Sequence, residues 1–272
     1  MLTESDLAYV AREMKARCGI AISRDMGGFV ETRLTPLARR EGFAAVSEFL
    51  STARTRQSEA MWTAIADALM QSESRFFRDR DAFINLREKV LPDLFARKRA
   101  RLRVLSAGCG GGQEPYSLAM MMEDMRDQGL PGADILAVDL SDRLLEKARS
   151  GLYTQFEVQR GLPIRSLIKH FEKAGELWRI SDRLRAGVRF QQHNLTQACD
   201  TLGQFDLILC RHVLSNFDPA HRKATLERLA IAAAPGAVLM LSPAEDYRGE
   251  SEAFIPGEAG LATRNPEWKQ AA

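Results

Sequence analysis

The chain has 272 residues, of which 27% are charged and 45% are apolar, and its formal net charge is +2. These proportions exclude a disordered or fibrous protein, and the nearly balanced charge argues against nucleic acid as a partner. The four cysteines form no C-x-x-C pair, so neither a disulfide framework nor a metal site is expected. The length predicts one large domain or two unequal ones.

Two features predict a cytoplasmic protein that does not insert into a membrane. The first six residues are acidic and lack the apolar segment of a signal peptide. The longest apolar stretch, residues 230–241, is interrupted by Pro235 and Gly236 and is too short to span a bilayer. Unpaired cysteines agree with the same compartment.

The first 70 residues predict helices only. In the first helix Ser5 is the expected cap, Gly19 follows the expected end, and apolar residues recur at helical spacing between them. Further helices are expected over residues 25–40, 44–56 and 58–70. We assign residues 1–75 to an N-terminal helical domain. A longer amphipathic helix is expected over residues 79–98, where Pro92 should end or kink it.

After residue 101 the pattern changes to an alternation of short apolar runs and helical segments. The expected strands are residues 102–106, 134–139, a third starting at 188–190, 205–210 and 237–241. Helices are expected from about residue 114 and over 141–149 and 219–233. Such alternation predicts an α/β domain with a doubly wound parallel sheet, over residues 76–272. Residues 151–190 interrupt the pattern and read as a small inserted subdomain, in which 176–180 and 184–190 are expected to pair as a hairpin.

A glycine-rich turn between the first expected strand and the next helix is the central motif. It runs from Gly108 to Gly112 and is followed by Gln113 and Glu114. Glycines let the backbone approach a ligand, and the amides that start the next helix favour a polar or anionic group. A turn without a ligand would show the same glycines, so the motif alone leaves both interpretations open.

Asp139 ends the second expected strand, and its position favours the interpretation that the glycine turn binds a ligand. An acid there can accept hydrogen bonds from both ribose hydroxyls of an adenine nucleoside, although it could instead cap the following helix. The turn has neither a P-loop lysine nor the G-x-G-x-x-G pattern of dinucleotide sites. Glu114 would repel a pyrophosphate but suits the ammonium and sulfonium groups of S-adenosylmethionine. The sequence therefore favours this methyl donor over NAD.

Four stretches of the chain resemble the CheR-type chemotaxis protein-glutamate O-methyltransferases, and they occur in that family's order. They are residues 72–78 (S-E-S-R-F-F-R), 112–117 (G-Q-E-P-Y-S), 146–153 (E-K-A-R-S-G-L-Y) and 205–214 (F-D-L-I-L-C-R-H-V-L). The resemblance covers nearly the whole chain, and the F-F-R-D and E-P-Y-S phrases are far more specific than the glycines. It implies a Rossmann-like class I methyltransferase sheet with an all-helical N-terminal domain and a small β insertion.

The resemblance implies methyl transfer from S-adenosylmethionine to glutamate side chains of chemoreceptors, with S-adenosylhomocysteine as the product. A glutamate carboxylate is already ionised at neutral pH, so it needs no general base. This agrees with the lack of an obvious Ser-His-Asp or Cys-His constellation. A donor-binding regulatory module with weak or no transferase activity is the alternative. A nucleic-acid methyltransferase is disfavoured, because the sequence lacks a [DN]-P-P-[YF] motif.

The same resemblance assigns residues to the donor. Arg78, the one expected catalytic residue, should reach the donor's carboxylate end or the incoming glutamate, unless it is a plain surface arginine. Glu114 should meet the donor's amino group and Asp139 its ribose. Asn194 and Leu195 match a pair beside the adenine, or else form a turn. The other expected donor contacts are Ser72, Ser74, Gly108, Arg211 and His212.

Several residues depart from the family pattern. Ser72 stands where Asn is common, Ser74 where Thr is common, and His212 where Asn is usual. An imidazole still donates and accepts hydrogen bonds, but it is larger and can become charged. Asn216 stands where some members carry a Tyr proposed to assist catalysis. These changes bear on donor affinity and rate more than on the fold.

The expected partners are the cytoplasmic helices of methyl-accepting chemoreceptors. In the family the helical domain meets acidic methylation helices, and this chain has seven basic residues against three acids over residues 12–40. An ordinary solvated face is the alternative. The basic residues are Arg12, Lys15, Arg17, Arg24, Arg33, Arg39 and Arg40. The inserted segment looks shorter than in members that grip a C-terminal receptor pentapeptide, so we expect this protein not to need that tether.

Overall fold

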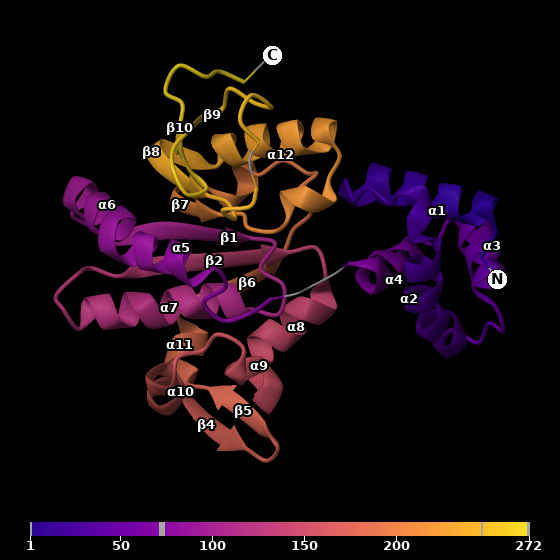
Figure 1. Ribbon diagram of the computed structural model, residues 1–272, viewed down its shortest axis with the longest axis horizontal. Coiled ribbons are helices and arrows are strands. Elements are labelled where there is room, and N and C mark those ends of the chain that lie inside the picture. Colours follow the sequence, from indigo (N-terminus) through magenta and orange to yellow (C-terminus); the bar gives the residue numbers. More distant parts are fainter. Residues whose placement is uncertain (1, 71–73, 246, 271–272) are drawn as a thin grey trace. The chain divides into compact units, whose positions relative to one another are not determined.

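Two compact units make up the computed structural model, which describes residues 2–70, 74–245 and 247–270 (Figure 1). The first unit contains the described residues before the break at 71–73 together with Asn216–His221, and the second contains the other described residues. Within these ranges, no helix is long and apolar enough to cross a membrane.

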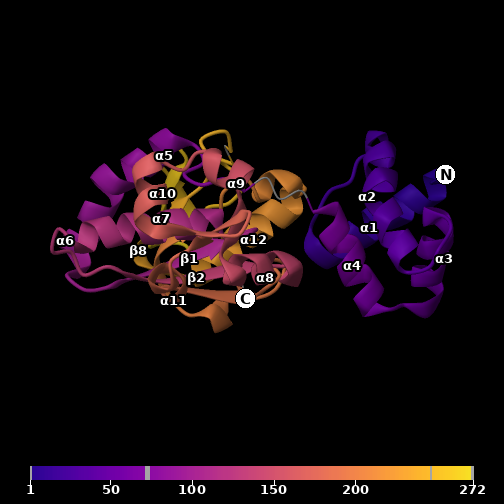
Figure 2. The ribbon, with the colours of Figure 1, turned by 90° about the horizontal axis from the view of Figure 1, so that it is seen from below.

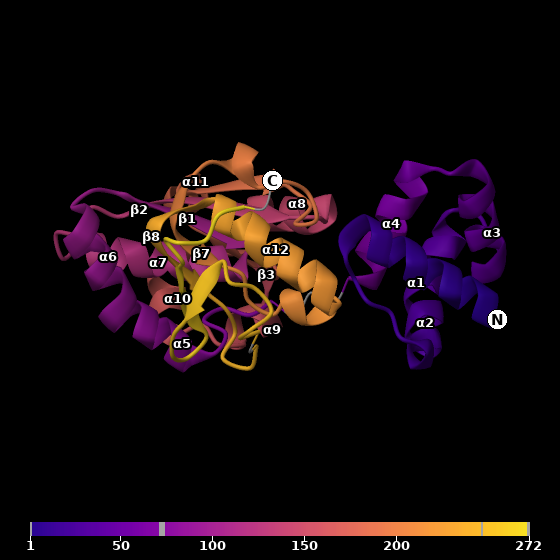
Figure 3. The ribbon, with the colours of Figure 1, turned by 90° about the horizontal axis from the view of Figure 1, so that it is seen from above.

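Four helices form the first unit and confirm the helices expected there. They are α1 (Glu4–Cys18), α2 (Gly27–Arg40), α3 (Val46–Arg56) and α4 (Glu59–Leu69). Figures 2 and 3 show them packed around one another. Their apolar stripes meet in a core that includes Val10, Leu34, Phe49 and Trp62, all of which are buried.

The start of α1 differs from the expectation. Thr3 caps the helix, not Ser5, because Asp6 at the third helical position completes a capping box with Thr3. In that arrangement the Thr3 hydroxyl accepts from the Asp6 N–H at 3.1 Å, and the Asp6 carboxylate accepts from the Thr3 N–H at 3.2 Å. Gly19 ends the helix in the left-handed conformation, as the sequence predicts.

The expected helix over residues 79–98 is broken into three parts. They are α5 (Arg80–Asn85), the π-helical turn η2 (Leu86–Val90) and α6 (Leu91–Lys98). Pro92 explains the break, since its ring lacks an N–H and clashes with a carbonyl one turn earlier. The helix widens just before it, so that the Leu91 N–H bonds to the Leu86 carbonyl. Pro92 then lies in the first turn of α6, where no N–H is required.

The second unit is built on a seven-stranded sheet in the order β6-β2-β1-β7-β8-β10-β9 (Figure 1). Its strands are β1 (Leu102–Ala107), β2 (Ala133–Asp139), β6 (Val188–Gln192), β7 (Phe205–Leu209), β8 (Ala233–Met240), β9 (Phe254–Pro256) and β10 (Leu261–Arg264). The first five pair in parallel and confirm the predicted doubly wound sheet, while β10 runs antiparallel between β8 and β9. β9 and β10 are absent from the expected strands because runs of three and four residues carry too little periodicity.

The order of the strands places a ligand crevice at β1. α7 (Gln113–Arg126) connects β1 to β2, α8 (Asp142–Ser150) follows β2, and α12 (Pro219–Ile231) lies between β7 and β8 in the chain. The chain moves outward from β1 to β2 and β6, and then returns to β7 on the other side of β1. In open α/β sheets, ligands bind at such a switch point, outside the carboxyl ends of the strands.

The small β insertion is present, but the expected hairpin within it is wrong. β3 (Leu152–Thr154), β5 (Leu177–Ile180) and β4 (Phe171–Ala174) form a separate antiparallel sheet, with α9 (Gln155–Gln159) and α10 (Ile164–His170) beside it. Residues 177–180 pair with 171–174 across a tight turn at Gly175, which has a φ of 63°. Residues 182–186 form α11 (Asp182–Ala186), and the strand that follows joins the main sheet beside β2.

Tyr153 of β3 connects the small sheet to the glycine turn. Its hydroxyl donates to the carbonyl of Gly111 at 2.8 Å. Its ring packs edge-on against Phe76 and Phe171, with ring centroids 5.0 and 6.3 Å away. Because Tyr153 is fully buried, the inserted subdomain supports the turn through a hydrogen bond that water cannot replace.

We expect Tyr153→Phe to lower the free energy of unfolding by roughly 1–3 kcal/mol, because the buried Gly111 carbonyl loses its donor while the ring contacts stay. Urea unfolding measures this change. Tyr9→Phe, at a half-buried tyrosine of the helical unit, is the matched control and should shift the value by less than about 0.5 kcal/mol. Equal effects of the two substitutions would show that the Tyr153 hydroxyl does not support the turn.

Candidate active site

The turn after β1 is a tightly packed backbone turn that has no room for side chains at its glycines. Gly108, Gly110 and Gly112 have φ values of 73°, 54° and 88°, a left-handed conformation that glycine adopts at little cost. A Cβ on Gly108 would lie 2.4 Å from Cγ2 of Val213, and one on Gly112 would lie 2.8 Å from Cβ of Ala148. The turn therefore packs directly against the loop after β7 and against α8.

Asp139 closes β2 and faces this turn. Its carboxylate accepts hydrogen bonds from the N–H of Gly110 at 2.8 Å and of Ser141 at 3.0 Å. The side chain is buried, and a carboxylate can accept about four hydrogen bonds in all. Ser141 caps α8 by accepting from the Leu144 N–H, so Asp139 is not the cap of that helix.

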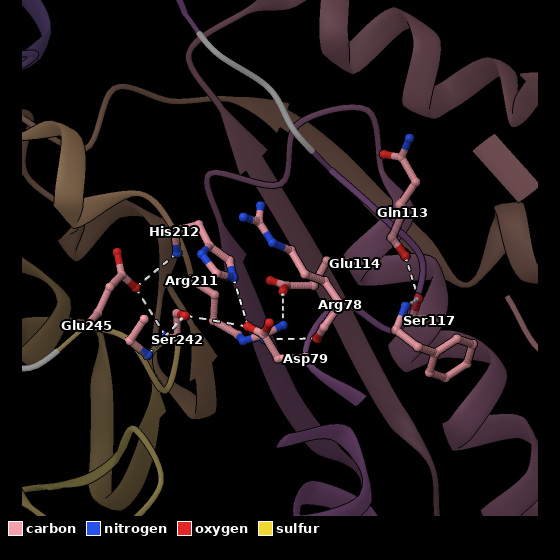
Figure 4. A network of polar contacts seen from close by, with 11 residues as sticks. Arg78, Asp79, Gln113, Glu114, Ser117, Arg211, His212, Ser242 and Glu245 are labelled. Carbon is pink, nitrogen blue, oxygen red and sulfur yellow. Dashed lines mark hydrogen bonds and ion pairs between the residues drawn. The ribbon is translucent and has the colours of Figure 1, made fainter. Parts of the chain in front are cut away.

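Arg211 lies at the centre of an ionic network at the same crevice (Figure 4). Its side chain is fully buried. Nη1 donates to Oε2 of Glu114 at 2.7 Å, and Nη2 donates to Oδ2 of Asp79 at 2.7 Å and to the carbonyl of Arg78 at 2.9 Å. A buried guanidinium is tolerated when it is paired and hydrogen-bonded in this way. The network joins the segment before α5, the start of α7 and the loop after β7.

Asp79 also holds His212 on that loop. Its Oδ2 lies 2.8 Å from Nε2 of His212 and 3.4 Å from Oγ of Ser242. Phe77, Asp79 and His212 have φ values of 48°, 56° and 58°. Such angles are rare outside glycine and persist only where the surrounding contacts enforce them, as they do at functional sites.

The charges around Asp79 lower its pKa. Burial alone would raise the pKa, but the hydrogen bond with His212 and the charge of Arg211 outweigh burial, so the pKa lies below the usual 3.8. A group of this kind stabilises the fold above its unfolded pKa and loses that contribution as the pH falls through its folded pKa. Asp79 therefore remains ionised throughout the neutral range.

Glu245 fixes the backbone of the loop after β7. Its buried carboxylate accepts hydrogen bonds from the N–H groups of His212, Ser215 and Ser242 at 2.9, 3.2 and 3.1 Å. Neither Glu245 nor Asp79 is among the residues expected from the sequence. Asp79 is the last residue of the F-F-R-D motif, so that motif was a signal for it in the sequence. Glu245 lies outside all four motifs.

The structure brings most of the expected site residues together. Arg78, Glu114, Arg211 and His212 meet in one network of polar contacts that includes Asp79 (Figure 4), and Gly108 lies against Val213 of the same loop. Asp139 lies at the other end of that turn through its bond to the Gly110 N–H.

The remaining expected residues lie around this group or cannot be placed. Asn194 and Leu195 follow β6, and the N–H of His193 donates to the carbonyl of Asp139 at 3.0 Å. Oδ1 of Asn194 accepts from the N–H and hydroxyl of Thr196, so the pair forms a turn. Ser74 is half-buried. Ser72 lies outside the described residues.

The cysteines of the site are not nucleophiles. Burial raises the pKa of Cys109 and of Cys210 well above the usual value, with nearby carboxylates adding to the shift. A thiol that stays protonated at neutral pH is inert. In the part of the chain that the structure describes, no group of three or more His, Cys, Asp or Glu side chains is placed to hold a metal ion.

A sheet of this order, with a glycine-rich turn after β1 and an acid closing β2, has the features of a nucleoside-binding α/β domain. Residues 72–259 match the family model described as "CheR methyltransferase, SAM binding domain". The chain belongs to the CheR methyltransferase family, and both the family and the methyl donor predicted from the sequence are confirmed.

Named relatives are similar in sequence to this chain over most of their lengths. The chain is 32% identical to "Chemotaxis protein methyltransferase 1" of Vibrio cholerae over 93% of this chain and 94% of that protein. It is 30% identical to "Chemotaxis protein methyltransferase" of Listeria monocytogenes over 96% of this chain and 95% of that protein. Among solved structures, SAM-bound CalS10 of Micromonospora echinaspora, an amino pentose methyltransferase, aligns with 63% of this chain and 58% of its own at 19% identity and a TM-score of 0.34.

We expect Gly108→Ala to destabilise the fold and weaken donor binding, because the new Cβ collides with Val213. Gly129→Ala is the matched control, since Gly129 has a φ of 91° and open space around its Cα. Both changes carry backbone strain, so the excess loss for Gly108→Ala, roughly 1–3 kcal/mol in urea unfolding, reports the collision.

The double variant Gly108→Ala/Val213→Ala provides the cross-check. Removing the Val213 methyl groups should recover part of the stability that Gly108→Ala loses. If the double variant is no more stable than Gly108→Ala alone, the turn and the loop after β7 are not packed as described.

Proposed function

We propose that this chain transfers methyl groups from S-adenosylmethionine to glutamate side chains in the cytoplasmic helices of methyl-accepting chemoreceptors, and that it acts in the cytoplasm. The observation that carries the proposal is the cluster at the carboxyl ends of the neighbouring strands β1 and β7, where residues of the CheR motifs meet in a chain of that family. The donor is a property of the family, whereas the glutamate acceptor rests on the chemistry argued below.

The residues of the crevice suit the chemistry of the donor. Asp139 offers carboxylate oxygens to ribose hydroxyls, and Glu114 offers one to an ammonium group. Nε of Arg211 is buried without a hydrogen-bond partner among the described residues, so a carboxylate acceptor beside it would satisfy an otherwise costly donor. The left-handed φ values of the glycine turn are ones that other residues rarely adopt, and a backbone without side chains can approach a ligand closely. Asn194 and Leu195 are the proposed neighbours of the adenine, and Ser72, Ser74 and His212 complete the proposed donor contacts.

The acceptor chemistry requires placement more than proton transfer. S-adenosylmethionine supplies a methyl group on a sulfonium, which a glutamate carboxylate oxygen takes while the electron pair of the broken carbon–sulfur bond stays on sulfur. Since the carboxylate is already ionised, no side chain of this protein has to remove a proton. Arg78 is the proposed catalytic residue, because a guanidinium binds and orients a carboxylate through paired hydrogen bonds.

The helical unit offers a surface for an acidic partner. Of the seven basic residues over positions 12–40, Arg17 is half-buried and paired with Glu13 and Glu59, while the other six are exposed. The exposed six are Arg12, Lys15, Arg24, Arg33, Arg39 and Arg40. Arg12, Lys15 and Arg40 pair with Glu13, Asp218 and Glu41, and the excess of basic side chains would steer and orient the acidic methylation helices of a receptor.

The inserted subdomain supports docking without a receptor pentapeptide. Its central hairpin consists of two four-residue strands joined by only Gly175 and Glu176, which leaves little surface beyond the strands themselves. We therefore propose that receptors lacking the C-terminal pentapeptide are modified as well as those that carry it.

A labelled-methyl assay on purified receptor cytoplasmic fragments, with and without the pentapeptide, tests the proposal. The expected result is label that alkali releases as methanol, since glutamyl methyl esters are base-labile, at equal rates on both fragments. Fragments with the acceptor glutamates changed to glutamine should take up none. Donor binding without transfer would contradict the proposal and select a regulatory module instead, and alkali-stable label would show another acceptor.

Asp139→Asn should weaken donor binding about 10- to 100-fold in calorimetry, because a neutral amide replaces a charged acceptor worth roughly 1.5–3 kcal/mol per hydrogen bond. Asp134→Asn changes an exposed acid at the other end of the same strand and is the matched control. Donor affinity should be unchanged by Asp134→Asn. Equal donor affinities of the two variants would show that Asp139 does not bind the donor.

A further inference from the structure

Arg78 lies between two residues with strained backbones. Phe77 and Asp79 have φ values of 48° and 56°, which residues other than glycine rarely adopt. Such conformations persist only where the surrounding contacts enforce them, and an observed one is a reason to ask what it positions. The contacts that hold this short segment come from two places, the helix α7 and the loop after β7.

Ser117 of α7 holds the segment on the side before Arg78. Its side chain is fully buried, and its Oγ accepts a hydrogen bond from the N–H of Phe77 at 2.9 Å. The same hydroxyl donates to the carbonyl of Gln113, one turn earlier in the helix, at 2.7 Å (Figure 4). A hydroxyl has one proton to donate, so the bond to Gln113 directs that proton into the helix and leaves the lone pairs of the oxygen for Phe77.

Arg211 holds the segment from Arg78 onward. Its Nη2 donates to the carbonyl of Arg78 at 2.9 Å and to Oδ2 of Asp79 at 2.7 Å. The ring of Phe77 packs edge-on against the ring of Phe83, with the centroids 5.4 Å apart. The backbone on both sides of Arg78 is therefore fixed, by a serine on one side and by an arginine on the other. The direction in which the Arg78 side chain leaves the backbone is fixed with it.

We propose that Ser117 is a positioning residue for methyl transfer, because its hydroxyl keeps Phe77 in the left-handed conformation and so holds Arg78 in one orientation. The inference rests on the proposed function, in which Arg78 orients the acceptor carboxylate. Without the Ser117 oxygen, the Phe77 N–H loses its acceptor, and relaxation of Phe77 toward an ordinary φ swings the residue that follows. A misplacement of about 1 Å can slow a reaction roughly 100-fold.

Amide hydrogen exchange of the full chain, followed at Phe77, tests whether the serine holds the segment. Ser117→Ala should speed this exchange at least about tenfold, because the N–H loses its acceptor. Ser117→Cys keeps the volume but offers a weaker acceptor, so its exchange rate should fall between the two. Ser106→Ala is the matched control and should leave the exchange unchanged. Ser106 is also fully buried, but its Oγ has no hydrogen-bond partner within the described residues.

Methyl transfer to receptor cytoplasmic fragments tests whether the serine acts through Arg78. At saturating concentrations of donor and receptor, Ser117→Ala should slow transfer about tenfold while the donor Kd stays within about twofold of the wild type. In an Arg78→Ala background the same substitution should change the rate by less than about twofold, because the residue that it positions is gone. Ser106→Ala should change neither the rate nor the donor Kd.

Two results would overturn the inference. One is exchange of the Phe77 amide at the wild-type rate in Ser117→Ala. The other is an equal slowing of transfer by Ser117→Ala with and without Arg78, which would show a general structural effect. A wild type that transfers no methyl groups, or an Arg78→Ala variant as fast as the wild type, would instead contradict the proposed function. Slow exchange at Phe77 that depends on Ser117 would set that failure apart from a serine that does not hold the segment.

Discussion

The pairing of the buried Arg211 guanidinium with Glu114 and Asp79 is the interaction on which the crevice depends. Two carboxylates brought this close, with little water between them, would repel each other. The hydrogen bond with His212 and the charge of Arg211 together keep Asp79 ionised. Breaking a buried pair from one side typically costs about 3–5 kcal/mol. The three segments that supply these residues are far apart in the chain, so this contact fixes them relative to one another.

The two walls of the crevice are built by different means. On the side of β2, the wall is backbone: left-handed glycines and the N–H groups bound to Asp139. On the side of β7, the wall is a network of side chains, in which Asp79 and Glu245 hold Arg211 and His212 in place. The first wall is the one to which we assign the nucleoside of the donor under the proposed function. The second wall supplies charged groups, which the proposed donor would meet.

The sequence predicts the parts of this site that depend on local order. Strand–helix alternation identifies β1, β2 and β7, and the topology of a doubly wound sheet then brings Glu114, Asp139 and Arg211 to one edge. Contacts that depend on tertiary packing are not readable in this way. Asp79 meets Arg211 only because the segment before α5 folds over the carboxyl edge of the sheet, and Glu245 follows a strand whose neighbours β9 and β10 carry no clear pattern. The strand pairing of the insertion is not readable from the sequence for the same reason, since it is set by the turn at Gly175 rather than by apolar periodicity.

A crystal structure of the chain with S-adenosylhomocysteine tests the central claim most directly. The account predicts the ribose hydroxyls on the carboxylate of Asp139 and the amino group of the homocysteine part at Glu114, with the thioether sulfur facing the loop after β7. Nucleoside density elsewhere on the molecule, or a crevice that stays empty at saturating concentrations of the compound, would contradict it.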